Sequence, residues 1–347
     1  MNHPYLMNHP RRIRSVSFIF ALLAIASASA LGEMPGYSPE DDPALEEIIP
    51  AGVTPDPEQR AIVLEAVPQV YLCRVEYNAA GNVRAIYLSN HPALSNRKKV
   101  IAAYGEETPE RAGIDAATLA RFAAFGDLEE IIMLHQNPGA EGFVALDHWP
   151  NLISFRVEYI DHADFMPKIN ALQNLRWLEL KHLFGLKETR VDELGTFPYL
   201  ERLELDNASA QEEALTFLAR NPSIRDFELH RSGLDNEDIG TIVDLLPNLE
   251  RLCLKPQGAN HFDAGALVHV KRLEGLKVFG FHQWSPDMYV WEDGIEYLAG
   301  IPSLQSIEVA ARHDPAVIEM LLAERPDVSE AKGKNELILT DWSIERK

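Results

Sequence analysis

The chain of 347 residues contains only two cysteines, Cys73 and Cys253. The repeat pattern described below places Cys253 in the seventh repeat strand and Cys73 just before the first. Strands about 4.8 Å apart would separate the two thiols by roughly 25–30 Å, which is beyond the reach of a disulfide. We therefore expect two free thiols and no cysteine-based metal cluster.

Basic residues are also scarce, with 32 Lys and Arg against 53 Asp and Glu, for a formal charge of −21. A charge of this sign repels phosphate backbones, so nucleic acid is excluded as an expected partner. The same acidity also favours solubility.

Recognisable catalytic motifs are absent. The sequence has no H-E-x-x-H, G-x-S-x-G or Walker motif. Histidine lies beside acidic residues at 161–164 and 261–263, where we interpret these groups as caps and surface polar residues. We expect no enzyme activity, no catalytic residue, no cofactor and no metal site.

The N-terminal apolar run, residues 17–26, is shorter than the ~20 residues that cross a membrane. It follows three arginines and precedes Ala28-Ser29-Ala30, a small-x-small cleavage pattern. These features predict a cleaved signal peptide at residues 1–30, hence a secreted or periplasmic protein with no membrane span after cleavage. An uncleaved anchor is the alternative.

Residues 31–60 are rich in proline and acidic groups, and this composition predicts a flexible spacer. Two β-rich runs follow, at 70–77 and 83–89, joined by a segment that contains Gly81-Asn82. They predict a β-hairpin whose first strand caps the end of a sheet. Residues 61–82 are accordingly assigned to an N-terminal cap.

The rest of the chain follows one recurring pattern. The octets PYLERLEL (198–205), PSIRDFEL (222–229) and PNLERLCL (247–254) share an L-x-x-L-x-L core and recur every 24 or 25 residues. Such a period is typical of a stacked-repeat protein. The pattern predicts a repeat domain at 83–328 and a C-terminal cap or tail at 329–347, with a weak further unit at Val328. The repeats start at Val83, Leu128, Leu152, Leu175, Leu200, Ile224, Leu249, Leu276 and Leu304.

These motifs resemble the leucine-rich repeat family, as found in exported bacterial-type proteins. The resemblance implies an α/β horseshoe solenoid, with a parallel β-sheet on the concave face and helices on the convex face. One such helix is predicted after Asp235, with Ile239, Ile242 and Val243 on one face. The ladder of Asn or Cys that many members carry after the last Leu is missing, so the repeats are irregular.

Alternate residues of each strand should face the concave surface, where they form columns across neighbouring repeats. The first column is Trp177, Arg202, Asp226 and Arg251; the second is Arg156, Glu179, Glu204, Glu228 and Cys253; the third is Glu158, Lys181, Asp206, His230, Lys255 and His282. Arg202, Asp226 and Arg251 alternate in sign and could satisfy one another. Glu179, Glu204 and Glu228 stack like charges, which suggests a basic partner beside Trp177, an aromatic of the type favoured in binding hot spots.

A second candidate surface is the loop 282–291, which contains Trp284, Tyr289 and Trp291. Loops on a rigid scaffold often carry recognition, although these aromatics could equally cover the adjoining core. The candidate partner-binding residues are therefore Trp177, Glu179, Arg202, Glu204, Asp226, Glu228, His230, Arg251, Trp284, Tyr289 and Trp291.

The resemblance implies a non-enzymatic scaffold that binds a protein or peptide, in the simplest case one with a basic surface. Fold alone does not fix function. Two alternatives stay open: an enzyme or enzyme subunit acting on an extracellular polymer, and a structural envelope protein that self-associates. The sequence leaves the oligomeric state open.

Overall fold

A computed structural model describes residues 37–91, 95–104, 111–136, 138–160, 165–182, 191–206, 211–232, 235–256, 264–281, 294–309, 319, 322–323 and 325–332. The chain divides into two compact units, Met1–Trp149 and Pro150–Lys347. The predicted signal peptide and the loop residues Trp284, Tyr289 and Trp291 lie outside the described residues.

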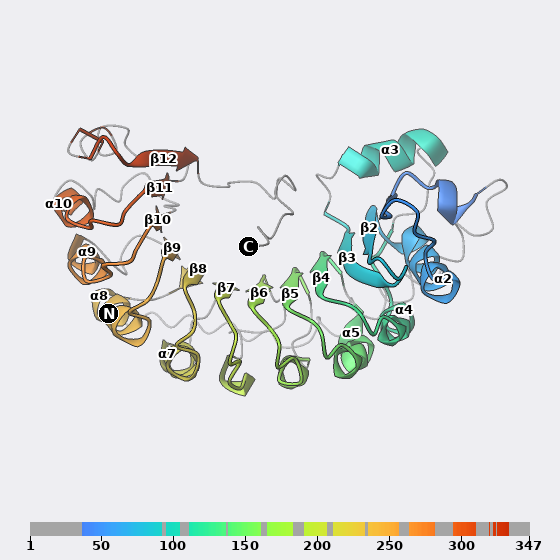
Figure 1. The fold of residues 1–347 in the computed structure, drawn as a ribbon, viewed down its shortest axis with the longest axis horizontal. Helices are drawn as coiled ribbons and strands as arrows, with labels where there is room; N and C mark the ends of the chain where they lie inside the picture. The colour runs from blue at the N-terminus through green and yellow to red at the C-terminus, as the bar shows by residue number, and fades with distance from the viewer. Residues whose placement is uncertain are drawn as a thin grey trace, which may run out of the picture. The chain divides into compact units, whose positions relative to one another are not determined.

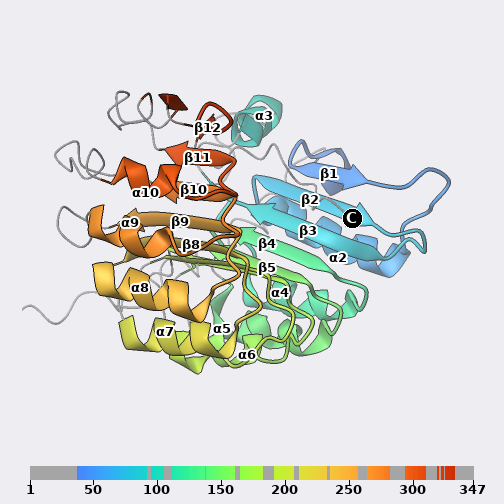
Figure 2. The same ribbon diagram turned by 60° about the vertical axis from the view of Figure 1, so that its left-hand side comes forward.

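The second unit is built on a parallel sheet whose strands follow one another in chain order. Each strand coincides with one predicted repeat, and Figure 2 shows β8 to β12 stacked edge to edge. The strands are β5 (Ser154–Glu158), β6 (Trp177–Lys181), β7 (Arg202–Asp206), β8 (Asp226–Ser232), β9 (Arg251–Pro256), β10 (Val278–Phe281), β11 (Ser306–Val309) and β12 (Ser329–Lys332).

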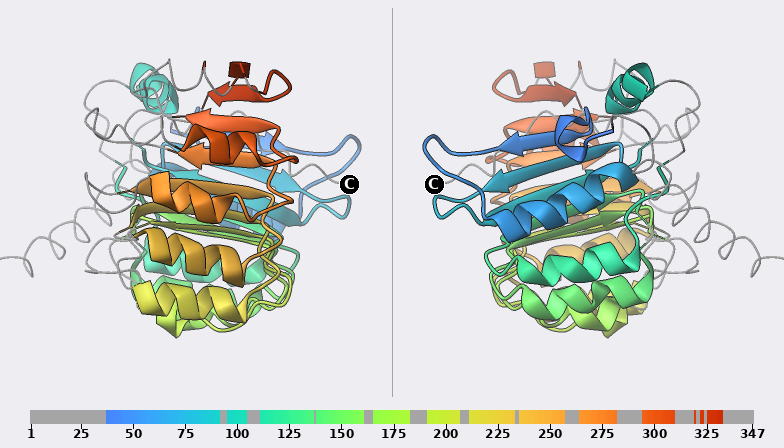
Figure 3. Two further views of the ribbon diagram at one scale, coloured as in Figure 1. Left: turned by 90° about the vertical axis from the view of Figure 1, so that its left-hand side faces the viewer. Right: turned by 90° about the vertical axis from the view of Figure 1, so that its right-hand side faces the viewer.

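Helical segments connect these strands and cover one face of the sheet (Figure 1). In the left panel of Figure 3, α7 to α10 lie in front of the strands in yellow to orange. The segments are α6 (Met166–Ile169), η5 (Val191–Glu193), α7 (Gln211–Arg220), α8 (Asn236–Leu245), α9 (Ala264–Val270) and α10 (Ile295–Ala299). This order of parallel strands and covering helices is the predicted α/β solenoid of leucine-rich-repeat type. We call the face turned away from these helices the inner face.

The repeated leucines form the core between the strands and the helices. In the octet 198–205, which runs into β7, Leu200, Leu203 and Leu205 are all fully buried. Phe227 takes one such position in β8 and is buried as well. Because side chains alternate along a strand, burying these positions turns the residues between them toward the inner face.

Helix α8 begins as predicted. The side chain of Asp235 accepts hydrogen bonds from the backbone N–H groups of Glu237 and Asp238, at 2.9 and 3.0 Å. Asp238 returns the contact by accepting from the backbone N–H of Asp235, which completes a capping box. Ile239 and Ile242 are buried on the face turned to the core.

Asparagine braces neighbouring repeats, although at a position other than the one the family pattern uses. Buried Asn221 accepts a hydrogen bond from the backbone N–H of Phe197 at 2.7 Å and donates to the carbonyl of Phe217 at 2.8 Å. Asn170 likewise donates to Glu193 O and accepts from Gly195 N. Both asparagines follow a helix and precede a strand, so the turn before the strand is braced.

The first unit contains the predicted hairpin, with β2 (Leu72–Tyr77) antiparallel to β3 (Val83–Ser89). Strand β4 (Glu130–Leu134) pairs in parallel with β3. Helices α2 (Pro57–Ala66) and α4 (Ala116–Arg121) cover one face of these strands, as the right panel of Figure 3 shows. The remaining elements are η1 (Pro39–Asp41), η2 (Val67–Gln69), α3 (Ser95–Tyr104), η3 (Phe122–Ala124), α5 (Gly139–Gly142) and η4 (Phe143–His148).

The structure differs from the prediction of a flexible spacer at residues 31–60. Strand β1 (Leu45–Ile48) pairs in parallel with β2, so the first hairpin strand is not the end of the sheet. Buried Asp42 forms an ion pair of 2.6 Å with Arg111, whose guanidinium also donates to two backbone carbonyls. Backbone pairing and a buried ion pair hold this segment, and neither is visible in its low apolar content.

The sheet extends past the predicted boundary at residue 328 and includes the strand of the weak further unit predicted at Val328. Residues 329–332, assigned to a cap or tail, form β12 and pair in parallel with β11. Neither Cys73 nor Cys253 is in a disulfide, and both are buried, as expected. Across the ranges described above, the helices are too short or too polar for any of them to cross a bilayer.

Candidate functional site

The strand registers confirm the predicted columns of the inner face. Trp177 pairs with Arg202, Arg202 with Asp226 and Asp226 with Arg251. The second column also runs in register, from Arg156 through the three glutamates to Cys253. In the third column, Glu158 is level with Lys181, and Asp206 is level with His230.

The three stacked glutamates are buried rather than displayed. Glu179, Glu204 and Glu228 are 2, 3 and 5% exposed. Buried carboxylates are tolerated when cations and hydrogen bonds compensate them. Here the compensating cations come from the chain itself, which removes the reason for expecting a basic partner to supply them.

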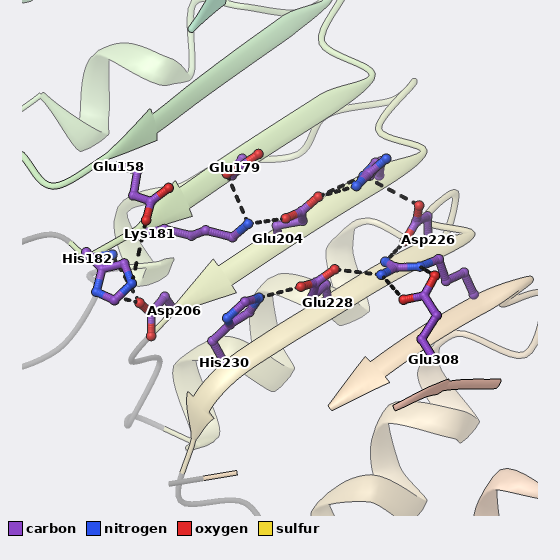
Figure 4. Close-up of polar contacts among 12 residues, drawn as sticks. Glu158, Glu179, Lys181, His182, Glu204, Asp206, Asp226, Glu228, His230 and Glu308 are labelled. Atoms are coloured by element: carbon purple, nitrogen blue, oxygen red, sulfur yellow. Dashed lines mark hydrogen bonds and ion pairs between the residues drawn. The ribbon is translucent and has the colours of Figure 1, made fainter. Parts of the chain in front are cut away.

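Glu179 and Glu204 are compensated from both sides. Arg156 Nε donates to Glu179 at 2.6 Å, and Lys181 Nζ lies 3.0 Å from the other oxygen of the same carboxylate. Lys181 also pairs with Glu204, whose second oxygen accepts from Arg202 (Figure 4). Lys181 therefore bridges two neighbouring strands.

Arg251 likewise bridges carboxylates on different strands, further along the sheet. Its guanidinium lies 2.9 Å from Asp226, 2.8 Å from Glu228 and 2.8 Å from Glu308. Glu308 is on β11, so Arg251 reaches across β10. The residue of β10 level with Glu308 is Gly280, whose missing Cβ leaves room for Cys253, since a Cβ there would lie 2.5 Å from Sγ of Cys253.

The predicted ladder of Arg202, Asp226 and Arg251 is confirmed, since both arginines contact Asp226. Together these groups form the inner-face charge network, in which four cations and His230 compensate five carboxylates. Its members are Arg156, Glu179, Lys181, Arg202, Glu204, Asp226, Glu228, His230, Arg251 and Glu308.

The pairing decides the pKa values inside this network. Burial alone would lower the pKa of Lys181, but Glu179 and Glu204 outweigh it and raise that pKa. Burial would raise the pKa of Glu204, but Lys181, Arg202 and Arg156 together outweigh it, so the pKa of Glu204 is lowered. Both groups are therefore charged at neutral pH.

Trp177 is half-buried between two arginines. The guanidinium carbons of Arg156 and Arg202 each lie 4.0 Å from its ring centroid. Cation–π contact of this kind orders all three side chains. The glutamates below hold the same arginines, so the aromatic group and its neighbours are fixed in advance of any binding.

A second polar group lies at the carboxyl ends of β5, β6 and β7. It consists of Glu158, Tyr159, His182 and Asp206, and we call it the strand-end cluster. The imidazole of His182 lies between the two carboxylates in Figure 4. Burial raises the pKa of Glu158 to about 7.

Sequence reasoning placed Glu158 and Asp206 in the third column but missed His182 and Glu308. Glu308 could have been found by aligning the octet 302–309 with the earlier ones, since it occupies the position of Glu228. His182 directly follows a predicted strand, and no periodic signal marks it. His282, Trp284, Tyr289 and Trp291 lie outside the described residues, and the side chain of Lys255 does too.

One group in the network has the composition of a metal site. Ligand atoms of Glu204, Glu228 and His230 lie within 4.8 Å of one another. These carboxylates, however, already bind Lys181, Arg202 and Arg251. A divalent ion there would have to displace permanent cations, so the geometry favours the internal ion pairs.

The register, the buried leucine ladder and the covering helices define the class: a parallel α/β solenoid of leucine-rich-repeat type. No protein-family model matches the sequence, and no curated protein matches it. Among solved structures, the fold matches the "Crystal structure of TLR13-ssRNA13 complex" with 16% sequence identity and a TM-score of 0.30. The match covers 82% of this chain and 38% of that chain.

Proposed function

We propose that this chain is a non-enzymatic scaffold that binds a protein or peptide on the inner face of β5 to β9. The observation that carries the proposal is the ordered group formed by Trp177, Arg156 and Arg202. Tryptophan and arginine are the residues most enriched in binding hot spots. Because buried glutamates already order these arginines, binding would cost little side-chain entropy.

The exposed chemistry of this face differs from the acidic surface expected from the sequence. The side chain of Arg202 is 35% exposed and that of Arg156 is 24% exposed, whereas the side chains of Glu179 and Glu204 are almost fully buried. Around Trp177 a partner would therefore meet the two guanidinium groups before it met the carboxylates of Glu179 and Glu204. We propose a partner that offers acceptor oxygens, either acidic side chains or backbone carbonyls, rather than a basic surface.

Export from the cytoplasm is part of the proposal and rests on the sequence of residues 1–30. The expected mature chain begins at Leu31 and is found in the secreted or periplasmic fraction. N-terminal sequencing of the protein purified from that fraction checks the cleavage site. Recovery of an intact N-terminus in the membrane fraction would favour an uncleaved anchor.

Binding is tested by capture from the matching exported fraction, using the chain from Leu31 onward as bait. Trp177→Ala should weaken the affinity for the captured partner by about tenfold or more, as expected of a hot-spot aromatic. Tyr199→Ala is the matched control, because Tyr199 is 55% exposed in the same unit and outside the charge network. Both variants are first compared with the wild type by thermal unfolding.

Equal affinity of the wild type and Trp177→Ala would contradict the inner face as the binding surface. Equal losses in both variants would point to a general effect on the fold. Loss in Trp177→Ala alone supports the proposal.

A further inference from the structure

Glu158 stands apart from the other buried acids of the inner face. It is 5% exposed, and within the described residues its carboxylate accepts no hydrogen bond. Its ion-pair partner there is His182, whose Nε2 lies 3.6 Å from Oε1 of Glu158. Buried carboxylates are normally hydrogen-bonded or paired with a permanent cation, or they coordinate a metal.

The separation of these two atoms fits a shared ligand better than a direct bond. A distance of 3.6 Å exceeds the usual limit for a hydrogen bond between nitrogen and oxygen. Two ligand atoms held about 2.1 Å from one tetrahedral zinc ion lie about 3.4 Å apart. The pair is therefore spaced to bind one ion between its members with little movement.

His182 is held so that Nε2 points toward Glu158. Its Nδ1 lies 3.3 Å from Oδ2 of Asp206, and its backbone N–H donates to the same oxygen at 3.2 Å. Its ring stacks on Tyr159, with centroids 4.2 Å apart and planes 5° from parallel. A carboxylate on one imidazole nitrogen is the usual arrangement of a histidine whose other nitrogen binds a metal.

The backbone conformation also places Tyr159 and His182 beside Glu158. Tyr159 and His182 both adopt left-handed conformations, with φ of 58° and 47°. Such values are uncommon for residues other than glycine, asparagine, aspartate and histidine, so Tyr159 is the less usual of the two. They turn the chain at the ends of β5 and β6 and bring the two rings together beside Glu158 and Asp206.

We propose that Glu158 and His182 bind a divalent transition-metal ion, with Asp206 as the positioning residue for the imidazole. The ligand atoms are Oε1 of Glu158 and Nε2 of His182. The side chain of His182 is 22% exposed, which leaves an approach for the ion and for water to fill its remaining positions. One nitrogen and one carboxylate oxygen suit zinc, cobalt or nickel, whereas calcium and magnesium need several oxygens.

Electrostatics also distinguishes this cluster from the neighbouring group of Glu204, Glu228 and His230. There, lysine and arginine side chains already neutralise the carboxylates. Within the described residues the ion-pair partner of Glu158 is His182, a side chain without a permanent charge. A divalent ion would place a permanent positive charge beside this carboxylate.

The test is isothermal titration of chelator-treated full-length protein with zinc chloride, with magnesium chloride as the hard-ion comparison. We expect zinc to bind at one site that Glu158→Gln and His182→Gln each weaken by at least tenfold. Asp206→Asn should weaken it by about 10- to 100-fold, the usual effect of losing such a positioning carboxylate. His230→Gln is the matched control and should leave the affinity unchanged.

Urea unfolding in EDTA shows whether each variant is folded before titration. Absence of zinc binding in the wild type would overturn the proposal. Zinc binding that Glu158→Gln leaves unchanged would identify an adventitious ion only, and loss caused by His230→Gln would move the site to Glu204 and Glu228. The readout is metal affinity, so its outcome does not depend on whether a protein partner is captured.

Discussion

At the scale of single residues, the buried carboxylates of the inner face differ in how far nearby cations offset the effect of burial on their pKa values. Glu204 has a lowered pKa because Lys181, Arg202 and Arg156 together outweigh the effect of its burial. Glu158 lies further from Lys181, and burial dominates, so its pKa rises from 4.5 to about 7. The pKa values of two buried carboxylates, one on β5 and one on β7, are therefore shifted in opposite directions.

The raised pKa of Glu158 makes a prediction about stability in metal-free protein. Between about pH 4.5 and 7 the folded state holds a proton that the unfolded state releases, so the contribution of Glu158 to stability is lost as the pH rises through 7. Glu158→Gln mimics the protonated acid. It should match the wild type near pH 4.5 and exceed its free energy of unfolding by about 1–3 kcal/mol at pH 8.

The measurement is urea unfolding at several pH values in the presence of EDTA. Glu237→Gln serves as the control, because Glu237 is exposed on α8 and should show no such trend. A difference between Glu158→Gln and wild type that stays constant from pH 5 to 8 would contradict the prediction.

At the scale of elements, the helices and strands are stabilised by different means. Strands gain from leucines buried against the helices, whereas the short helices depend on their caps. For α8 the cap is Asp235, whose carboxylate satisfies two backbone N–H groups.

Asp235→Ala should therefore reduce the free energy of unfolding by about 1 kcal/mol. Asp244→Ala near the other end of α8 removes an exposed pair with Arg272 and should cost less than about 0.5 kcal/mol. Denaturant unfolding followed by circular dichroism compares the two. Equal losses would show that the capping box contributes no more than a surface ion pair.

The sequence predicted the positions of the secondary-structure elements better than it predicted side-chain contacts. The period of the leucines predicted the strands of the second unit, and a period of two along each strand predicted its columns. β1 was missed because it is held by backbone pairing and by the nearby pair of Asp42 and Arg111, which leave little trace in composition. The contacts of Lys181 and His182 were missed because a column fixes which side chains are neighbours but not which rotamers they adopt.

At the scale of the whole molecule, a stacked-repeat unit gains its stability from each repeat and from the interface with its neighbour. A defect in one repeat should therefore weaken the adjacent repeats most. Leu203 on β7 is fully buried, so Leu203→Ala should cost about 2–5 kcal/mol.

Hydrogen exchange is expected to show the largest loss of protection in β6, β7 and β8, with a smaller change in β11. Tyr199→Ala, at an exposed position in the same repeat, is the control. A uniform loss of protection over the whole second unit would mean that it unfolds as one block.

Arg251 modifies this nearest-neighbour description at the carboxyl end of the repeats. From β9 its guanidinium contacts Glu308 on β11, across the intervening strand β10. The interaction adds a coupling between second neighbours to a chain of otherwise adjacent couplings. Three repeats, rather than two, then share one ion pair, so β9 to β11 should open together as a single cooperative segment instead of fraying strand by strand.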